Sequence, residues 1–237
     1  MARYPIFHPV IKLIIGILVG WNSQVSNAED YRTRHNDFKV NHYPVKSGGP
    51  YKQHPELSQG IFLIAGRNLN DPNFNKSVIL ITDFNETGTT GLIINKSTDI
   101  HIDQVLPQFS QWNSITRYLN IGGPVATRSF SLLVRSSKDL PASGSKHIID
   151  DIYLINTMEM LNYIPDQDEN KTFFKLYLGY AGWSPGQLES ELLRGDWHLW
   201  HADADLIFET AFSEIWHQLI ELVSAKWVFV NALELFE

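Results

Sequence analysis

The sequence predicts an α+β protein, with a mixed, curved β-sheet and flanking helices. Short apolar, β-branched runs recur along the chain and outnumber the segments with helical spacing. Strands and helices also fail to alternate regularly, as they would in a protein built from βαβ units. The chain has 237 residues and 43% hydrophobic composition, which suits one large domain or two small ones with a substantial core.

Residues 1–28 are predicted to be a secretory signal peptide. Arg3 and Lys12 precede the apolar run Leu13–Trp21, and Ser26 and Ala28 place small residues at positions −3 and −1 of a cleavage site. The run is shorter than the about 20 residues of a transmembrane helix, so we expect no stable membrane span after cleavage. This predicts a periplasmic or secreted protein. An uncleaved anchor or a misassigned start codon is the alternative.

Residues 29–56 are predicted to be a polar extension or linker, because no hydrophobic period holds there and Gly48, Gly49 and Pro50 interrupt the chain. The folded domain is predicted to span residues 57–237. Its expected strands are Ile61–Ala65, Ser77–Thr82, Gly91–Asn95, Phe130–Val134, Ile152–Ile155 and Phe173–Tyr180. The second and third of these are expected to form a hairpin with a longer loop. The expected helices are Ile102–Leu106, Thr157–Tyr163 and Phe212–Val223.

The last of these helices is amphipathic, which indicates core packing, with a homodimer interface as the alternative. The apolar stretches Trp227–Val230 and Leu233–Phe236 follow it, and they need to pack back on the domain or to contact a partner.

The segment Leu178–Leu193 has the strongest local signals in the chain. Ser184 is placed as a helix N-cap, Pro185 as the first helical residue and Gln187 as the partner of Ser184 in a capping box. Trp183 and Leu188 have the spacing of a hydrophobic staple, and Gly195 that of a left-handed C-cap. Glu189 and Glu191 are two residues apart and so do not face each other as an acid/base pair; a solvated face or a helix-terminus charge is expected instead.

Composition and motifs exclude several kinds of site. The chain has no cysteine, which excludes disulfides, thiolate metal sites and a cysteine nucleophile. Its net charge of −7 makes nucleic acid an unfavourable partner. No GxSxG elbow, HExxH pair or phosphate-binding P-loop is present, so we predict no catalytic residue and no cofactor. We also predict no metal site: on a strand His198 and His201 point to opposite faces, although with Asp203 they include zinc ligand types.

Five ordered segments carry a family resemblance: Gln59–Ala65, Asp71–Val78, Gly91–Lys96, Gly122–Val125 and Leu178–Leu192, continued by Trp197, Asp205–Phe208 and Trp216. With these motifs the chain resembles the YqgE/AlgH family of bacterial proteins over about residues 57–216. The resemblance implies one α+β domain with a partly barrel-like mixed sheet. It also brings the label of a transcriptional regulator and the cytoplasmic location typical of the family. The exported start departs from that location.

The candidate binding residues are those where glycines permit close approach beside strand ends: Asn95, Gly122, Gly123, Gly182, Trp183 and Gln187. The Gly122–Gly123 pair has two interpretations, a backbone anion nest or a turn ended by Pro124. Asn95 is expected either to bond a loop backbone or to line a pocket. We therefore predict a non-enzymatic protein that binds an unknown protein or small ligand. A transcriptional regulator and a hydrolase with an unrecognised polar cluster are the alternatives.

Overall fold

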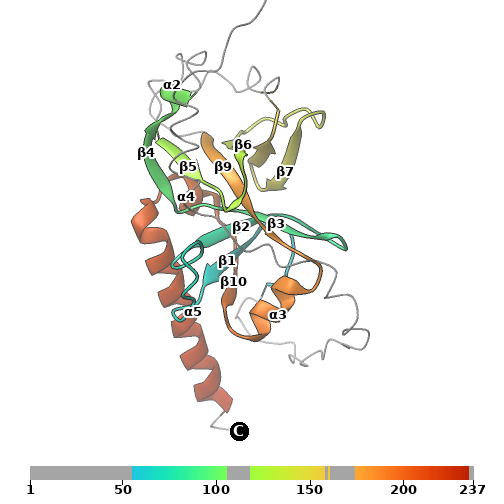
Figure 1. Cartoon of the computed structure of the whole chain (residues 1–237). Helices are drawn as coiled ribbons and strands as arrows, with labels where there is room; N and C mark the ends of the chain where they lie inside the picture. The colour runs from blue at the N-terminus through green and yellow to red at the C-terminus, as the bar shows by residue number, and fades with distance from the viewer. Residues whose placement is uncertain (1–54, 106–117, 158–159, 161–173, 235–237) are drawn as a thin grey trace, which may run out of the picture. The chain divides into compact units, whose positions relative to one another are not determined.

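The computed structural model describes residues 55–105, 118–157, 160 and 174–234, and for residues 105 and 226–234 it describes the backbone alone (Figure 1). The predictions on the signal peptide and on nearly all of the polar extension lie outside these residues, as does most of the helix expected at Thr157–Tyr163. The described residues belong to one compact unit that extends from His54 to the C-terminus.

The described residues are mostly β-sheet. The strands are β1 (Ile61–Ala65), β2 (Val78–Asn85), β3 (Gly88–Ile93), β4 (Ser97–His101), β5 (Tyr118–Ile121), β6 (Val125–Arg135), β7 (Ser145–Ile149), β8 (Ile152–Ile155), β9 (Phe174–Trp183) and β10 (Trp197–His201). They join into a ten-stranded sheet with the order β10-β1-β2-β3-β9-β6-β8-β7, and β5 pairs with both β4 and β9. The pairing of β5 with β9 is parallel, whereas β9 pairs antiparallel with β3 and β6, so the predicted mixed sheet is confirmed.

The sheet curls until β7, the strand at one end, approaches β1 and β2 near the other end. The Gln59 side chain, just before β1, donates to the carbonyl oxygens of His147 and Ile148 on β7, at 2.9 and 3.2 Å. Lys146 of β7 also forms an ion pair with Asp83 of β2 at 3.2 Å. Strand β7 therefore lies close to the start of β1 and the end of β2. The result is a curled, half-barrel sheet.

Few helices accompany this sheet, so the α+β class holds only in outline. They are α2 (Ile102–Val105), α3 (Gln187–Leu193), α4 (Ala204–Phe208) and α5 (Phe212–Glu234). Helix α5 is tied to the sheet by a hydrogen bond from the Trp216 indole to the carbonyl oxygen of Ala65, at 2.8 Å. No helix among the described residues is long and apolar enough to cross a membrane.

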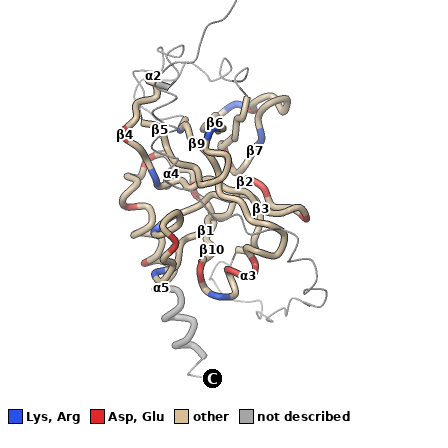
Figure 2. Tube along the Cα trace, in the orientation of Figure 1, with Lys and Arg blue, Asp and Glu red and all other residues tan. Residues whose placement is uncertain are grey.

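Alternate residues of the central strands enter two separate cores. Leu133 on β6 and Tyr177 on β9 belong to the larger cluster, which contains most of β1 and β2 and the buried face of α5. Their neighbours Leu132 and Leu176 belong to a smaller cluster with Ile102 of α2. This division follows from the two-residue period of side chains on a strand. Figure 2 shows that the strands carry few charged residues.

The structure corrects several local predictions. The hairpin between β2 and β3 has a two-residue connection, Glu86–Thr87, because Asn85 pairs directly with Gly88; the expected longer loop is wrong. Strands β4, β5, β7 and β10 were not predicted. Strands β4 and β7 carry Ser, Thr, Asp, Lys or His at half-buried or exposed positions, so they lack the apolar runs that mark the central strands.

Helix α3 begins at Gln187 and not at Pro185. Its N-cap is Gly186 with a left-handed φ of 77°, and no side chain caps it. Half of the predicted capping box is present, since the Gln187 side chain accepts a hydrogen bond from the backbone N–H of Ser184 at 3.1 Å. The predicted C-cap is confirmed. Gly195 has φ 78°, and its N–H and that of Asp196 donate to the last turn of the helix, which is the Schellman arrangement.

Candidate functional site

Both polar atoms of the Asn95 side chain form hydrogen bonds with backbone groups. Its Oδ1 accepts from the N–H of Val78 at 2.8 Å, and its Nδ2 donates to the carbonyl oxygen of Lys76 at 2.9 Å. The neighbouring Lys96 donates to the carbonyl oxygen of Asn73 at 2.6 Å, and burial lowers the pKa of its amine. Both side chains thus hold the turn Asp71–Ser77. Of the two expectations for Asn95, this is the bond to a loop backbone.

Gly122 and Gly123 allow two chain segments to come into contact. A Cβ atom at Gly122 would lie 2.3 Å from the carbonyl oxygen of Gly179, and one at Gly123 would lie 2.2 Å from the carbonyl carbon of Tyr180. The N–H of Gly122 donates to the carbonyl oxygen of Leu178 at 2.8 Å, so it is not available to an anion. The pair therefore serves the junction between β5 and β9, and the interpretation as an anion nest loses one of its two donors.

Gly182 lies near this junction but is exposed. A Cβ atom there would lie 3.2 Å from the Tyr180 ring and 3.8 Å from the Val125 side chain. Val125 is itself 38% exposed. The structure therefore brings Gly182 next to Val125, at the end of the Gly122–Val125 motif.

Strand β6 leaves its partner β9 directly after Val125. The pairing resumes only at Phe130, so the residues between form a bulge, and Ala126 within it has a φ of 46°. Arg128 and Ser129 of the bulge are exposed. We call Val125, Ala126, Arg128, Ser129 and Gly182 the bulge surface. Sequence reasoning missed the bulge because the expected strand began only at Phe130, where the pairing with β9 resumes.

Arg128 differs from the other arginines in the described part of the chain. Arg67, Arg135 and Arg194 each form an ion pair with a carboxylate, at 2.7 to 2.9 Å. No ion pair or side-chain hydrogen bond of Arg128 is found within the described residues. Its guanidinium is therefore the one that remains available to an external anion among the arginines that the structure describes.

Trp183 and Gln187 belong to a different group of contacts. The Trp183 and Trp197 indoles both donate to Oε2 of Glu191 at 2.8 Å, and Gln187 donates to its Oε1 at 2.9 Å. The two indole rings also pack against Phe74, with ring centroids 6.2 and 5.7 Å away. We call Phe74, Trp183, Glu191 and Trp197 the tryptophan clasp. It secures α3 and β10 to the turn that Asn95 holds.

The clasp assigns Glu191 a role that the sequence analysis did not predict. A solvated face or a helix-terminus charge was expected there. Instead Glu191 is half-buried and accepts from two buried tryptophans. The spacing of Glu191 from Trp183 and Trp197, eight and six residues, has no helical or strand period that could have indicated this contact.

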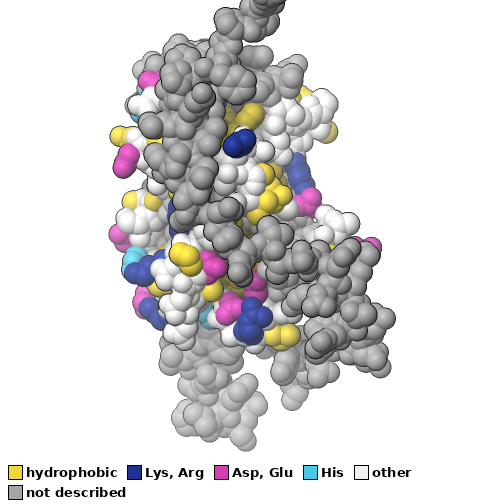
Figure 3. Space-filling model, viewed as in Figure 1, with side chains coloured by type: hydrophobic (Ala, Val, Ile, Leu, Met, Phe, Trp, Pro, Cys, Tyr) yellow, Lys and Arg dark blue, Asp and Glu magenta, His cyan; other side chains and the backbone are white. Residues whose placement is uncertain are grey.

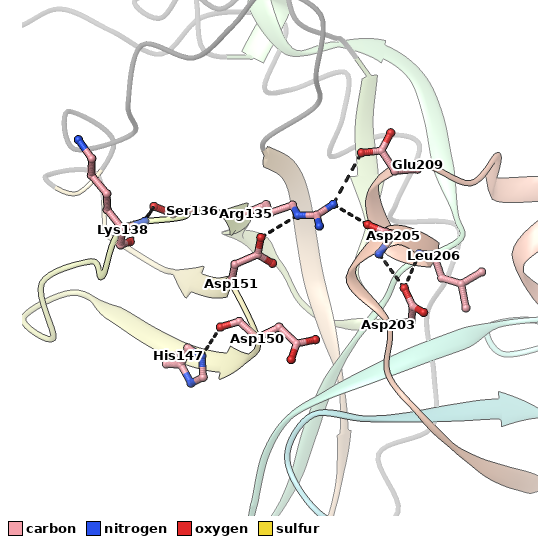
Figure 4. Close-up of polar contacts among 10 residues, drawn as sticks. All are labelled: Arg135, Ser136, Lys138, His147, Asp150, Asp151, Asp203, Asp205, Leu206 and Glu209. Atoms are coloured by element: carbon pink, nitrogen blue, oxygen red, sulfur yellow. Dashed lines mark hydrogen bonds and ion pairs between the residues drawn. The ribbon is translucent and has the colours of Figure 1, made fainter.

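A second polar group joins β6 to α4. Arg135 bonds Asp151 at 2.9 Å and Asp205 at 2.8 Å, and Glu209 lies 3.7 Å from the same guanidinium (Figure 4). The hydrogen bond with Asp151 is the main cause that raises the pKa of Arg135. Asp203 caps α4 by accepting from the N–H groups of Asp205 and Leu206. Arg135 therefore bridges carboxylates from two parts of the chain, and the group as a whole is acidic.

Lys175 of β9 lies beside the same helix. Its amine donates to the carbonyl oxygen of Ile207 at 2.5 Å and lies 4.1 Å from the centroid of the Phe212 ring. Burial lowers the pKa of Lys175 to about 8, against the opposing effect of Glu209. Lys175 thus links the sheet to the end of α4 and the start of α5.

The histidine candidates do not converge. His198 and His201 lie three residues apart on β10, which puts them on opposite faces of the strand. Burial lowers the pKa of His198. Asp203 is committed to the cap of α4. Within the residues that the structure describes, no group of three or more His, Asp or Glu side chains could hold a metal ion.

The six predicted site residues therefore divide into two groups. Gly122, Gly123 and Gly182 gather at the junction of β5, β6 and β9, next to the bulge surface. Asn95, Trp183 and Gln187 belong to the contacts around the turn Asp71–Ser77, and they bond groups within the protein. The first group borders exposed surface, whereas the second stabilises the fold.

Fold and sites together define a β-rich protein with a curled sheet whose described polar clusters are bonded internally. A family model described as AlgH-like matches residues 62–228, which is well over half of the chain. The chain belongs to the YqgE/AlgH family. The resemblance found from its motifs is thereby confirmed.

Relatives in other bacteria match most of the chain. A UPF0301 protein of Proteus mirabilis is 34% identical over 174 residues, which are 68% of this chain and 89% of the relative. One from Chlorobaculum tepidum is 30% identical over 181 residues, 76% of this chain and 94% of the relative. A crystal structure of a protein from Corynebacterium diphtheriae superposes with a TM-score of 0.59 at 24% identity and covers 71% of this chain and 88% of its own. This last likeness concerns the fold alone.

Proposed function

We propose that this protein acts by binding, without catalysis, and that it binds a protein partner or small ligand through the bulge surface. The observation that carries the proposal is the departure of β6 from the sheet between Val125 and Phe130. Bulges of this kind re-aim side chains and are common beside functional sites. Here the departure exposes Arg128, which has no ion pair among the described residues, three positions after the exposed Val125.

The backbone of Ala126 supports a functional use of the bulge. A residue other than glycine with a φ of 46° is held at a cost of about 1–3 kcal/mol. Such strain persists where the surrounding structure imposes it, and it is found at ligand clamps and switch segments. We attribute this strain at Ala126 to the bulge, which exposes Arg128.

Arg128 gives the proposed ligand a chemistry. A guanidinium forms paired hydrogen bonds with a carboxylate or phosphate, and these are stronger than bonds between neutral groups. Val125, at the start of the same bulge, is exposed and offers an apolar contact. We therefore expect a ligand that has an anionic group next to an apolar one.

The non-enzymatic part of the proposal is supported by the bonding of the polar clusters. Glu191 is saturated by two indoles and an amide, and the carboxylates around α4 face Arg135. A hydrolase would be favoured by a strongly perturbed carboxylate or histidine in a cleft. Among the described carboxylates and histidines, His198 is the one with a shifted pKa. It lies on β10, away from the bulge surface, so it does not indicate a hydrolase site there.

The transcriptional regulator remains the second proposal, and it predicts salt-sensitive DNA binding. Figure 3 shows acidic and basic side chains interspersed on the described part of the face in view, which is unfavourable for a phosphate backbone. A gel-shift assay at two salt concentrations, with full-length protein and mixed genomic fragments, tests the regulator.

We also propose that the protein acts in the periplasm, as its N-terminal sequence predicts.

The binding proposal is tested by a photo-crosslinking amino acid at position 129, which is exposed on the bulge surface and leaves Arg128 in place, with position 193 as the control because Leu193 is 83% exposed on α3. A captured partner is then purified, and its affinity is measured for Arg128→Glu, Gly182→Val and Leu193→Ser. We expect at least tenfold weaker binding for the first two and no change for the third. Equal affinity for all three variants would show that the bulge surface is not the binding site.

Gly123→Val is unsuitable for this experiment, although Gly123 is a candidate residue. Its added side chain would meet the backbone of Tyr180 at 2.2 Å, so any loss of binding would report a damaged fold. At Gly182 the nearest atoms belong to side chains at 3.2 Å or more, and these can shift. Gly182→Val therefore changes the surface and leaves the junction intact.

A further inference from the structure

Two buried polar atoms on the neighbouring strands β5 and β9 have no hydrogen-bond partner among the described residues. They are Oδ1 of Asn120 and the hydroxyl oxygen of Tyr177. Asn120 is 3% exposed and Tyr177 is fully buried, so bulk solvent reaches neither of them. A third such atom, Oδ1 of Asp151, belongs to a side chain that is 34% exposed. Nearly all buried polar groups in native proteins bond either a protein group or an ordered water molecule.

The two atoms lie on the same face of the sheet. Asn120 and Tyr177 are directly paired in the parallel ladder between β5 and β9, which run side by side in Figure 1. Leu119 and Leu176, the residues before them, both belong to the smaller core, whereas Tyr177 belongs to the larger one. Because side chains alternate along a strand, Asn120 shares the face of Tyr177.

The Asn120 amide is oriented by one of its two polar atoms. Its Nδ2 donates to the carbonyl oxygen of Leu176 at 3.0 Å, so Oδ1 is the end that still requires a donor. Burial raises the pKa of Tyr177, so the phenol keeps its proton and remains a donor. Two acceptor oxygens and one phenol proton are therefore present on this face, and a bridging group has to supply the missing donor.

Water has the chemistry and the reach that this bridge requires. It accepts the phenol proton and donates one of its own to the amide oxygen. With two hydrogen bonds of about 2.8 Å, it joins atoms up to about 5.5 Å apart, which exceeds the about 4.8 Å between neighbouring strands. Buried waters typically bond polar groups that the protein leaves unsatisfied, and they occur about once per 27 residues.

We propose that one buried water molecule joins the Tyr177 hydroxyl to Oδ1 of Asn120 and stabilises the pairing of β5 with β9. This parallel pairing has only two residue pairs, Asn120 with Tyr177 and Ile121 with Leu178. It leads directly into Gly122, whose N–H bonds the carbonyl oxygen of Leu178. The water therefore helps to hold the β5–β9 junction, and it does so independently of any ligand at the bulge surface.

Tyr177→Phe tests the water, because it removes only the hydroxyl group. If the hydroxyl is hydrogen-bonded to a buried water, the Tm of the full-length protein falls by about 2–4 °C, the loss expected for one hydrogen bond in a chain of this size. If it has no partner, its removal leaves the Tm unchanged or raises it. Tyr118→Phe is the matched control, since Tyr118 is 54% exposed, and it should not change the Tm. A Tyr177→Phe protein at least as stable as wild type overturns the proposal.

A second background tests whether Asn120 shares the water. Asn120→Leu replaces the amide by an apolar group of similar size, so adding Tyr177→Phe to it should cause no further fall in Tm. The same fall in both backgrounds overturns the bridge. A high-resolution crystal structure of the wild-type protein needs no variant. It should show a water oxygen within about 3.2 Å of both atoms, and the lack of such a water also overturns the proposal.

Discussion

At the residue scale, Glu191 is the side chain on which the polar contacts of the tryptophan clasp converge. Trp183 and Trp197 are 6% and 3% exposed, so water cannot replace the acceptor for their indole N–H groups. An unpaired buried donor costs about 1–3 kcal/mol. The stability of the clasp therefore depends on Glu191 and not on Glu189, the other acidic residue of α3.

Glu191→Ala is expected to lower the free energy of unfolding by about 2–4 kcal/mol, because it leaves both indole donors without an acceptor. Glu191→Gln keeps an acceptor oxygen and should lose about half as much. Urea unfolding followed by tryptophan fluorescence measures both variants. Glu189→Ala, an exposed change on the same helix, should stay within about 0.5 kcal/mol of wild type. A Glu191→Ala protein as stable as Glu189→Ala would exclude the clasp as a stabilising group.

Lys175 gives the protein a pH dependence of known sign. Burial holds its pKa in the folded protein at about 8, below the ordinary value of 10.5. Between these two values the unfolded chain binds a proton that the folded protein has released. Stability contributed through Lys175 therefore rises as the pH increases from about 8 toward 10.5.

Replacing Lys175 by Met removes this contribution and retains much of the apolar stem. The difference in unfolding free energy between wild type and Lys175→Met should change in favour of wild type as the pH rises from 8 to 10. Urea titrations at several pH values measure it, and the subtraction cancels groups that titrate in both proteins. A difference that is constant over this range contradicts the assignment.

At the element scale, the junction of β5 with β9 rests on glycines that admit no side chain. Gly123→Ala is expected to destabilise the protein by about 3 kcal/mol or more, because its Cβ would lie 2.2 Å from the backbone of Tyr180. Gly182→Ala, at an exposed position of β9, should cost about 1 kcal/mol or less. Thermal unfolding of the two variants compares them. Equal costs would mean that the junction relaxes easily.

The elements also show what sequence reasoning can reach. Strands β1 and β8 were predicted with their observed bounds, because uninterrupted apolar and β-branched runs require burial on both faces. Strands β4 and β7 were missed, since their polar residues acquire strand structure only from their partners. The start of α3 was wrong because Gly186 takes a left-handed conformation that delays the helix by two residues.

Some features of the candidate site could be predicted from the sequence, and others could not. The closeness of Gly122, Gly123 and Gly182 was foreseeable, because glycines beside strand ends permit such approaches. The clasp was not foreseeable, since its members come from three separate segments that only the folded sheet brings together. The bulge that exposes Arg128 depends on the pairing of β6 with β9, which single-sequence reasoning cannot assign.

At the scale of the whole molecule, the N-terminal sequence predicts export with cleavage after Ala28. Native protein from fractionated cells should be periplasmic and begin at Glu29, as shown by intact mass and N-terminal sequencing. Ala28→Arg should block cleavage, because position −1 requires a small residue. Asn27→Gln at the tolerant position −2 is the matched control. A full-length chain in the cytoplasm would contradict the prediction and would favour the regulator.

The pairing of β1 with β10 also determines when the chain can finish folding. Ile61 lies opposite His201 in the sheet, and the Trp216 indole bonds the carbonyl oxygen of Ala65, 151 residues earlier in the sequence. Strand β1 therefore lacks one of its two neighbouring strands until β10, near the end of the chain, has been synthesised. Contacts of such separation form slowly, because a long loop must close first. We therefore expect the pairing of β1 with β10 to be a late and slow step of folding.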